Sequence, residues 1–414
     1  MTQVFARQEA ALDDLRQMDR FRRLIPRAGH DFSSNDYLGL SVSDVLKDAA
    51  IEALGRGVAV GAGGSRLLRG NDAEHIALEQ EAAAFFGTEA ALFMGGGVNA
   101  NQAIFSALPQ KGDLVLYDAL IHASTHDGVR LGRAETRKFA HNDVKAAADE
   151  IARWRAMGGA GQIWIAIEAV YSMEGALAPL TAMCALAVQE DAVLVEDGAH
   201  ATGLFGDLGR GLAHGIAHRP KVLTLHTCGK ALGASGALIC GARVLIETLI
   251  NRARGFIFAT APSPLNAALA RAGLRDLATN PARRQRAWDN IDHAQAEAAR
   301  LCGLRGYDSQ ILPVVLGKEG LCMAVAGHLQ RQGFDIRGIR PPTVPQGTAR
   351  LRISITGTLT KPVITELFER LAPELERVDL DVAAAQTTAV EAPAVESPAV
   401  EAPAVESLVL EPQA

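Results

Sequence analysis

Long apolar runs and cysteine are both scarce in this sequence. The apolar run at residues 163–170 is among the longest, and it is far shorter than the roughly 20 residues of a membrane-spanning helix. Residues 1–23 are rich in charge and lack the apolar stretch of a secretory signal. Neither feature predicts a membrane segment. The five cysteines are Cys184, Cys228, Cys240, Cys302 and Cys322.

An odd number of widely spaced cysteines argues against a disulfide framework and against a zinc site. No metal is therefore expected, and the thiols favour a reducing cytoplasm. The sequence also lacks an excess of basic residues, since its net charge is -6. That balance gives no electrostatic reason to expect nucleic acid or an anionic membrane as a partner. With 48% hydrophobic and 21% charged residues, the composition is typical of a globular protein.

Short apolar runs alternate with helical patterns over residues 46–280. The expected strands lie at 91–94, 114–117, 163–167, 192–195, 222–225 and 237–240, and residues 143–155 are typical of the intervening helices. Apolar strands separated by helices predict a mostly parallel sheet that is covered on both faces. The predicted fold class is α/β, with a large domain at 46–280 behind an amino-terminal arm at 1–45. A polar helix is expected at 8–23 of that arm.

The pattern changes after residue 280. A long charged helix is expected at 282–301, followed by strands at 311–316 and 350–355 and helices at 320–332 and 361–371. This arrangement predicts a smaller carboxyl-terminal α+β domain at 281–383. From 384 to 414, Pro, Glu, Ala and Val recur in a short repeat. Such a composition cannot bury enough apolar surface to offset the entropy of ordering, which predicts a disordered tail.

The strongest local signal is a lone lysine, Lys230, in the segment Leu-His-Thr-Cys-Gly-Lys-Ala-Leu-Gly at 225–233. Its neighbours are small or apolar, and burial lowers the pKa of a lysine and frees its amine to attack a carbonyl. A Schiff-base lysine is one interpretation. A lysine that pairs with a carboxylate or reaches solvent is an equal alternative on this segment alone.

Two further motifs stand where strands end. Asp197 and His200 follow an apolar strand as Asp-Gly-Ala-His, and acidic groups at such ends face the ligand crevice of parallel sheets. Taken alone, this motif fits a metal site, part of a catalytic triad or, more commonly, an ion-paired loop. Gly95, Gly96 and Gly97 precede a predicted helix. They suit a phosphate cradle as well as a plain tight turn, and they do not form a dinucleotide fingerprint.

Together and in this order, the motifs resemble the α-oxoamine synthases, which are fold-type I pyridoxal-phosphate enzymes. The resemblance extends from residue 32 to about 371. It includes Ser-Ser-Asn-Asp-Tyr-Leu-Gly-Leu at 33–40, Gly-Gly-Ser-Arg-Leu at 63–67, His-Ala-Ser at 122–124, Tyr-Ser-Met-Glu-Gly at 171–175 and Gly-Thr-Ala-Arg-Leu-Arg at 347–352. The resemblance implies a large domain with a mostly parallel sheet, a smaller carboxyl-terminal domain, and a homodimer with its active site at the subunit interface.

The same resemblance implies roles for four residues around the cofactor, pyridoxal 5'-phosphate. Lys230 would hold it as a Schiff base and move the α-proton of the substrate. Asp197 would pair with the ring nitrogen and keep it protonated. His200 would bond the phenolic oxygen, and His122 would stack on the ring. Without the resemblance, a hydrogen-bonded loop histidine is the better interpretation of His122.

Further cofactor contacts are implied at five positions. Gly97 and Val98 would donate backbone N–H groups to the phosphate, helped by the hydroxyl of Thr227. Thr260 resembles a position that reaches the phosphate of the neighbouring subunit, and Ser172 would lie close to the ring. Considered alone, these hydroxyls are typical of turns and helix caps.

Substrate contacts are implied at four positions. Arg352 matches an arginine that clamps the amino-acid carboxylate, for which a planar guanidinium is suited. Asn35 matches an entry-loop residue near that carboxylate. A contact with the acyl substrate is carried over to Arg22 or Arg23. The alternatives are a surface ion pair for Arg352 and a turn residue for Asn35.

Two stretches favour one branch of the family. They are Lys-Phe-Ala-His-Asn-Asp at 138–143 and Arg-Pro-Pro-Thr-Val-Pro-Gln-Gly-Thr-Ala-Arg-Leu-Arg at 340–352. In that branch, L-alanine condenses with a pimeloyl thioester on CoA or acyl-carrier protein, with loss of carbon dioxide, in biotin formation. A sister synthase that uses glycine or serine with another acyl-CoA is the nearest alternative. A non-catalytic partner subunit of the same fold is a further one.

Overall fold

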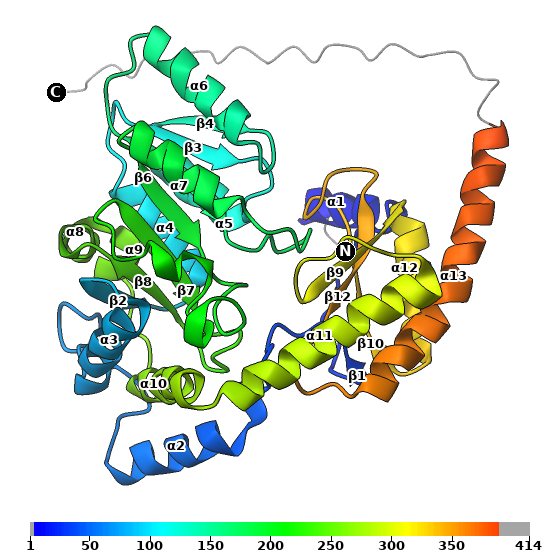
Figure 1. Cartoon of the computed structure of the whole chain (residues 1–414), viewed down its shortest axis with the longest axis horizontal. Coiled ribbons are helices and arrows are strands. Elements are labelled where there is room, and N and C mark those ends of the chain that lie inside the picture. Colours follow the sequence, from blue (N-terminus) through cyan, green and yellow to red (C-terminus); the bar gives the residue numbers. More distant parts are fainter. Residues whose placement is uncertain (1–3, 389–414) are drawn as a thin grey trace.

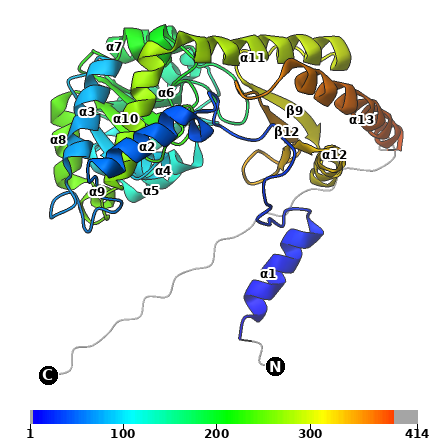
Figure 2. The same cartoon turned by 90° about the horizontal axis from the view of Figure 1, so that it is seen from below.

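The computed structural model describes residues 4–388, with side chains described as far as residue 377. They form a larger and a smaller lobe, joined by the long helix α11 (Pro281–Cys302) (Figure 1). Figure 2 shows the same two lobes side by side, with α1 (Ala6–Gln17) projecting from the side of the smaller lobe. Within the described residues, none of the helices combines the length and the apolar character needed to span a membrane.

The larger lobe contains a seven-stranded sheet. In spatial order its strands are β2 (Ala90–Met94), β8 (Ala237–Gly241), β7 (Val222–Thr227), β6 (Val193–Asp197), β5 (Ile163–Glu168), β3 (Leu114–Asp118) and β4 (Glu135–Phe139). Strand β8 is antiparallel to both neighbours, and strands β7, β6, β5, β3 and β4 run parallel. The prediction of a mostly parallel α/β sheet is confirmed. Strand β4 was not expected, because three of its five residues are charged and this exposed edge strand has no apolar pattern.

Helices cover both faces of this sheet. One face packs on α4 (Gly97–Ala107) and α8 (Arg243–Arg252), and the other packs on α6 (Val144–Ala156), α7 (Leu180–Gln189) and α3 (Ala73–Phe86). The remaining helices of the lobe are α2 (Asp44–Gly55), α5 (Ala123–Leu131), α9 (Arg254–Ile257) and α10 (Pro264–Thr279), with short 3-10 turns η1 (Leu40–Val42), η2 (Asp207–Gly209) and η3 (Leu212–Gly215). Local sequence sets the helix starts. For example, Asp143 caps α6 by accepting from Ala146 N.

The smaller lobe is built on a three-stranded antiparallel sheet. Its strands lie in the order β11 (Arg337–Ile339), β12 (Ala349–Ser354) and β9 (Ile311–Gly317), with α12 (Glu319–Arg331) and α13 (Lys361–Thr388) beside them. The arm joins this lobe through β1 (His30–Asp31), which pairs in parallel with β10 (Phe334–Asp335). Helix α11 begins at Pro281 and ends before Gly303, which adopts the left-handed conformation with φ 67°.

Two helices differ from their expected lengths. Helix α1 ends at Gln17 rather than at residue 23, so Arg22 and Arg23 lie in an extended segment. Helix α13 continues to Thr388, well beyond the expected end at residue 371. The first residues of the predicted tail, 384–388, therefore belong to a helix. The rest of that tail, 389–414, lies outside the described residues. The proposed domain limits at residues 45, 280 and 383 remain predictions.

All five cysteines are free thiols, and four of them are buried, while Cys302 is partly exposed. Burial raises the pKa of Cys228 to about 12 and those of Cys302 and Cys322 to about 11. Because the thiolate is the reactive form, these thiols are poor nucleophiles at neutral pH.

Strand β6 carries a buried carboxyl group, Glu196, on the face opposite Asp197. Glu196 is fully buried, and both of its oxygens lack a hydrogen-bond partner among the described residues. Burial, and then the neighbouring Asp197, raise the pKa of Glu196 to about 8. The folded chain thus keeps a proton here that the unfolded chain loses near the ordinary value of 4.5. Stability is fully present below that value and falls as the pH rises through the folded pKa.

We therefore expect Glu196→Gln to make the protein less sensitive to alkaline pH. The free energy of unfolding of the natural protein should fall by roughly 3 kcal/mol more than that of the variant between pH 5 and pH 8, because only the natural side chain titrates. Urea denaturation at both pH values measures the difference. The same change at the exposed Glu247 on α8 is the control. Parallel pH profiles for Glu196→Gln and the natural protein would contradict a neutral buried carboxyl.

Candidate active site

A cavity of about 390 Å³ opens at the carboxyl edge of the large sheet. Strands β5, β6 and β7 run parallel, so the side chains at their ends, Glu168, Asp197 and Thr227, meet at this edge. The sequence predicts some of the residues that line this cavity and not others. The predicted set is Asn35, Gly97, Val98, His122, Asp197, His200, Thr227 and Lys230. The structure therefore brings together residues from five separate motifs.

Lys230 and His200 form the centre of the cavity. The Nζ atom of Lys230 lies 3.0 Å from Nε2 of His200. Burial lowers the pKa of Lys230 to about 8, although the charge of the Asp197 carboxylate opposes the shift. Burial also holds the pKa of His200 well below 6.5, and the charges of Lys230 and Arg352 act in the same direction. At neutral pH the histidine is uncharged, and the amine has a substantial uncharged fraction.

A second set of hydrogen bonds holds Asp197 and His122. One carboxylate oxygen of Asp197 accepts from Ala199 N at 3.0 Å, and the other accepts from the side-chain amide of Asn101 at 2.9 Å. The same amide donates to Ser124 Oγ at 3.0 Å, and that hydroxyl lies 2.7 Å from Nδ1 of His122. Burial lowers the pKa of His122. The carboxylate and the neutral imidazole are thus fixed relative to each other.

The opposite end of the cavity suits an anion. Helix α4 starts here after Gly96, and its first turn has no side-chain cap, so its N–H groups face outward. A Cβ atom on Gly97 would come within 2.8 Å of the Thr227 methyl carbon Cγ2, so a glycine lets the backbone approach this side chain. The buried Thr227 Oγ1 has no hydrogen-bond partner within residues 4–388. An acceptor such as a phosphate oxygen would satisfy both groups.

A second cavity of about 520 Å³ adjoins the first at His122. Arg22 and Ser172 line it, together with the loop at 342–345. The guanidinium of Arg22 donates to Thr343 Oγ1 at 3.0 Å. Arg23 is exposed like Arg22, but it lines neither cavity and packs over the ring of Phe21 at 5.6 Å. Of the two arginines considered for the acyl substrate, only Arg22 faces a cavity.

Arg352 on β12 lies between the two cavities. It is buried, and its guanidinium donates to Ser172 O at 2.6 Å, Ser354 Oγ at 2.7 Å and Asn35 Oδ1 at 3.0 Å. These contacts fix the plane of the guanidinium and leave further N–H donors for a ligand. The alternative considered for Arg352, a surface ion pair, is not what the structure shows. Its contact with Asn35 joins the smaller lobe to the entry loop.

Thr260 lies apart from these residues. It lines a small cavity of about 130 Å³ with Gly95, Asn99 and Arg66, and it does not line the cavity of Lys230. Within one chain, therefore, Thr260 does not join the other predicted cofactor contacts.

Three residues of the site carried no expected role. Asn101 holds Asp197, the hydroxyl of Tyr37 contacts His200, and Glu168 lines the cavity. Burial, and then the charge of Asp197, raise the pKa of Glu168 well above its ordinary value, so this carboxyl group stays protonated beside Asp197. A signal existed for Asn101, which stands one helical turn after Gly97 and so shares its face of α4. Glu168 ends an apolar strand that is typical of core, and Tyr37 lies in the motif Ser-Ser-Asn-Asp-Tyr-Leu-Gly-Leu, in which only Asn35 carried an expected role.

Comparison with known proteins shows which family this chain belongs to. A profile of the aminotransferase class I and II family matches residues 29–371. The 8-amino-7-oxononanoate synthase of Anaeromyxobacter dehalogenans is 42% identical over 336 residues, covering 80% of this chain and 82% of that protein. The synthase of Geobacter sulfurreducens is 40% identical over 365 residues, covering 84% and 92%. The chain is a member of the α-oxoamine synthases, within the aminotransferase class I and II family.

Solved structures agree with this family. Serine palmitoyltransferase from Sphingomonas wittichii superposes on this α-oxoamine synthase with a TM-score of 0.81 at 26% identity. The match covers 91% of this chain and 97% of the other. The 8-amino-7-oxononanoate synthase of Francisella tularensis gives 0.70 at 28% identity, covering 84% and 98%. A serine palmitoyltransferase from S. paucimobilis, solved with bound PLP, gives 0.80 at 27% identity, covering 91% and 98%. The predicted fold-type I transferase fold is confirmed.

The residues of this α-oxoamine synthase fit pyridoxal phosphate. The cofactor has a phosphate at one end, a ring nitrogen at the other and an aldehyde between them. The α4 start and the unpartnered Thr227 hydroxyl suit the phosphate, and the Asp197 carboxylate suits a protonated ring nitrogen. The amine of Lys230 lies in the same cavity to receive the aldehyde.

Proposed function

We propose that this protein catalyses the 8-amino-7-oxononanoate synthase reaction, with pyridoxal 5'-phosphate bound through Lys230. L-Alanine and a pimeloyl thioester are joined, carbon dioxide leaves, and the thiol of the carrier is released with 8-amino-7-oxononanoate. The observation that carries the proposal is a buried amine with a lowered pKa, 3.0 Å from a neutral histidine, in a cavity that also holds a carboxylate. Relatives of that name, 40–42% identical over most of the chain, support this choice of reaction.

When bound, pyridoxal phosphate supplies an electron sink for the carbanion chemistry at the amino-acid Cα. The chain supplies proton transfer and orientation. Because the pKa of Lys230 is about 8, its Nζ can take up the α-proton and return it near neutral pH. The carboxylate of Asp197, held by Asn101 and Ala199 N, keeps a proton on the ring nitrogen. His122 lines the same cavity and would cover one face of the ring.

Substrate binding is assigned to the region between the two cavities. Arg352, fixed by its three contacts, and Asn35 would hold the carboxylate of L-alanine. The cavity that Arg22 and Ser172 line adjoins this point and would take the acyl thioester. Its mixture of apolar and charged lining suits an acyl chain with a polar end.

We further propose a cytoplasmic homodimer with the active site at the subunit interface. Thr260 lies outside the cavity of its own chain, which suits a contact with the cofactor phosphate of a second subunit. Large apolar side chains are also exposed on α2, at the cavity and on loops of the larger lobe. They include Ile51, Leu54, Val60, Leu67, Leu68, Val98 and Phe258. A second subunit would cover this apolar surface.

Steady-state kinetics with different substrates test the proposed reaction. We expect kcat/KM for L-alanine with pimeloyl-CoA to exceed that for glycine by about tenfold or more, because one fitted methyl group contributes about 1–3 kcal/mol. L-Serine and shorter or longer acyl-CoA substrates complete the comparison, and pimeloyl acyl-carrier protein tests the carrier. A clear preference for glycine would assign the protein to a sister synthase.

A serine-using synthase is the second candidate. The TM-score of 0.81 with serine palmitoyltransferase exceeds the 0.70 with 8-amino-7-oxononanoate synthase, whereas the relatives at 40–42% identity are of the latter kind. Turnover of L-serine with a long-chain acyl-CoA, above that of L-alanine with pimeloyl-CoA, would favour this second candidate.

A further inference from the structure

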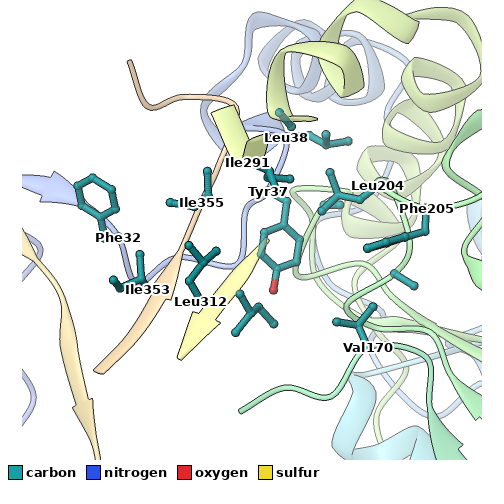
Figure 3. Close-up of a cluster of buried hydrophobic side chains, with 14 of the residues drawn as sticks. Phe32, Tyr37, Leu38, Val170, Leu204, Phe205, Ile291, Leu312, Ile353 and Ile355 are labelled. Carbon is teal, nitrogen blue, oxygen red and sulfur yellow. The ribbon is translucent and has the colours of Figure 1, made fainter. Parts of the chain in front are cut away.

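Tyr37 is buried at the junction of the two lobes, and its position has a consequence for His200. The ring is fully buried. Figure 3 shows it between Leu312 and Ile355 of the smaller lobe and Leu204 of the larger lobe, with its hydroxyl at the far end of the ring from Leu38 and Ile291. The apolar surroundings hold the ring in place. Only the hydroxyl reaches polar partners.

That hydroxyl connects two parts of the active site. Tyr37 Oη lies 2.6 Å from His200 Nδ1 and 3.1 Å from Asn35 Oδ1. On the other side of the imidazole, His200 Nε2 lies 3.0 Å from Lys230 Nζ. Asn35 Oδ1 in turn accepts from Arg352 at 3.0 Å. A continuous series of contacts thus runs from the guanidinium to the amine.

The single hydroxyl proton of Tyr37 decides the tautomer of His200. A neutral imidazole carries hydrogen on one nitrogen and accepts at the other. Burial raises the pKa of Tyr37, so its hydroxyl stays protonated and can donate. This one proton has two acceptors within reach, Asn35 Oδ1 at 3.1 Å and His200 Nδ1 at 2.6 Å. Asn35 Oδ1 already accepts from Arg352, so we assign the proton to the shorter contact with His200. When Tyr37 donates to Nδ1, the hydrogen of His200 must sit on Nε2.

We propose that Tyr37 is a positioning residue that holds His200 as the Nε2–H tautomer, so that this N–H group donates to the phenolic oxygen of the cofactor. The inference rests on the proposed function, because that oxygen belongs to pyridoxal phosphate. It assigns to Tyr37 an effect that acts through His200. A phenolic oxygen carries negative charge and needs a donor, which the other tautomer cannot provide.

Tyr37→Phe in the cofactor-loaded protein tests the inference. The visible absorbance of the bound cofactor is titrated with pH in the absence of substrate. We expect its apparent pKa to rise by about 0.5–1 unit, because the loss of one hydrogen bond of about 1 kcal/mol weakens the donor that stabilises the more negative form. Tyr307→Phe is the matched control. It removes one tyrosine hydroxyl, which donates to Pro313 O at 3.2 Å in the smaller lobe, away from all three cavities.

A second measurement detects the tautomer of His200 directly in the natural protein, so it does not depend on the stability of Tyr37→Phe. Nitrogen-15 NMR of the cofactor-loaded natural protein, with labelled histidine, should show His200 as the Nε2–H form, assigned by the signal lost in His200→Gln. An Nδ1–H signal for His200, or coincident absorbance titrations of Tyr37→Phe and the natural protein, would overturn the inference. Failure of the natural protein to acquire visible absorbance with pyridoxal phosphate would instead overturn the proposed function.

Discussion

Replacing Lys230 with alanine should abolish both condensation and the visible absorbance of the lysine-bound cofactor. The amine is the group in this cavity with a lowered pKa that can bond the aldehyde and then carry the α-proton. General acid–base groups contribute about 10²–10⁴-fold to rates, and the covalent attachment is lost as well. We therefore expect turnover to fall by at least about a thousandfold. Measurements of carrier-thiol release and of an absorbance spectrum with and without borohydride check this result.

Lys221→Ala is the control for that substitution. Lys221 precedes the same strand, β7, but its ammonium is half exposed and pairs with Asp191 at 2.7 Å. Its replacement should leave turnover unchanged. Condensation by Lys230→Ala at the natural rate would refute the proposed chemistry, including the assignment of the cofactor.

The second large effect is expected for Asp197→Asn. The variant keeps the shape of the side chain but removes the charge that holds a proton on the ring nitrogen. It also leaves a donor unpaired, because Asn101 and Ala199 N each donate to a separate oxygen of Asp197, and an amide has only one oxygen. We expect kcat to fall by about 10²–10³-fold, as is typical when a charge-stabilising group is removed. Steady-state kinetics and the absorbance of the loaded variant measure the loss.

Asp118→Asn is a matched comparison for Asp197→Asn. Asp118 is also buried at the end of a parallel strand, β3, and accepts from Asn142 N at 2.8 Å and from His141 Nδ1 at 2.9 Å. It lies outside the Lys230 cavity. Loss of a buried hydrogen-bonded carboxylate should lower stability in both variants, whereas only Asp197→Asn should change the spectrum of the bound cofactor. Equal spectra for Asp197→Asn and the natural protein would contradict the assigned role.

The sequence was sufficient to predict the fold class and much of the cavity lining. Apolar strands and helical spacing depend on neighbours along the chain, so the parallel sheet followed from them. The resemblance to the α-oxoamine synthases, carried by the order of the motifs, implied that Lys230, Asp197, His200 and His122 share one cofactor site before any distance was known. The edge strand β4 was not predicted, because its charged residues leave none of the apolar pattern by which a strand is recognised.

Other features depended on contacts between distant segments. Tyr37 meets His200 across 163 positions in the chain, and Asn101 meets Asp197 across 96. Spacing along a sequence carries no information on such pairs, so Tyr37 carried no expected role although its neighbour Asn35 did. That Arg22 lines a cavity and Arg23 does not also depends on contacts between distant segments. It depends on where the arm runs after α1 ends, and that path is set by contacts such as the one between Arg22 and Thr343.

The buried, protonated thiols described above make a simple colorimetric assay practical. Ellman's reagent reacts with thiolates, and the carrier releases one thiol in each proposed turnover. With four cysteines buried and the pKa of the partly exposed Cys302 at about 11, the folded protein should contribute little background colour. The same reagent then reports unfolding, since all five side chains become reactive in urea.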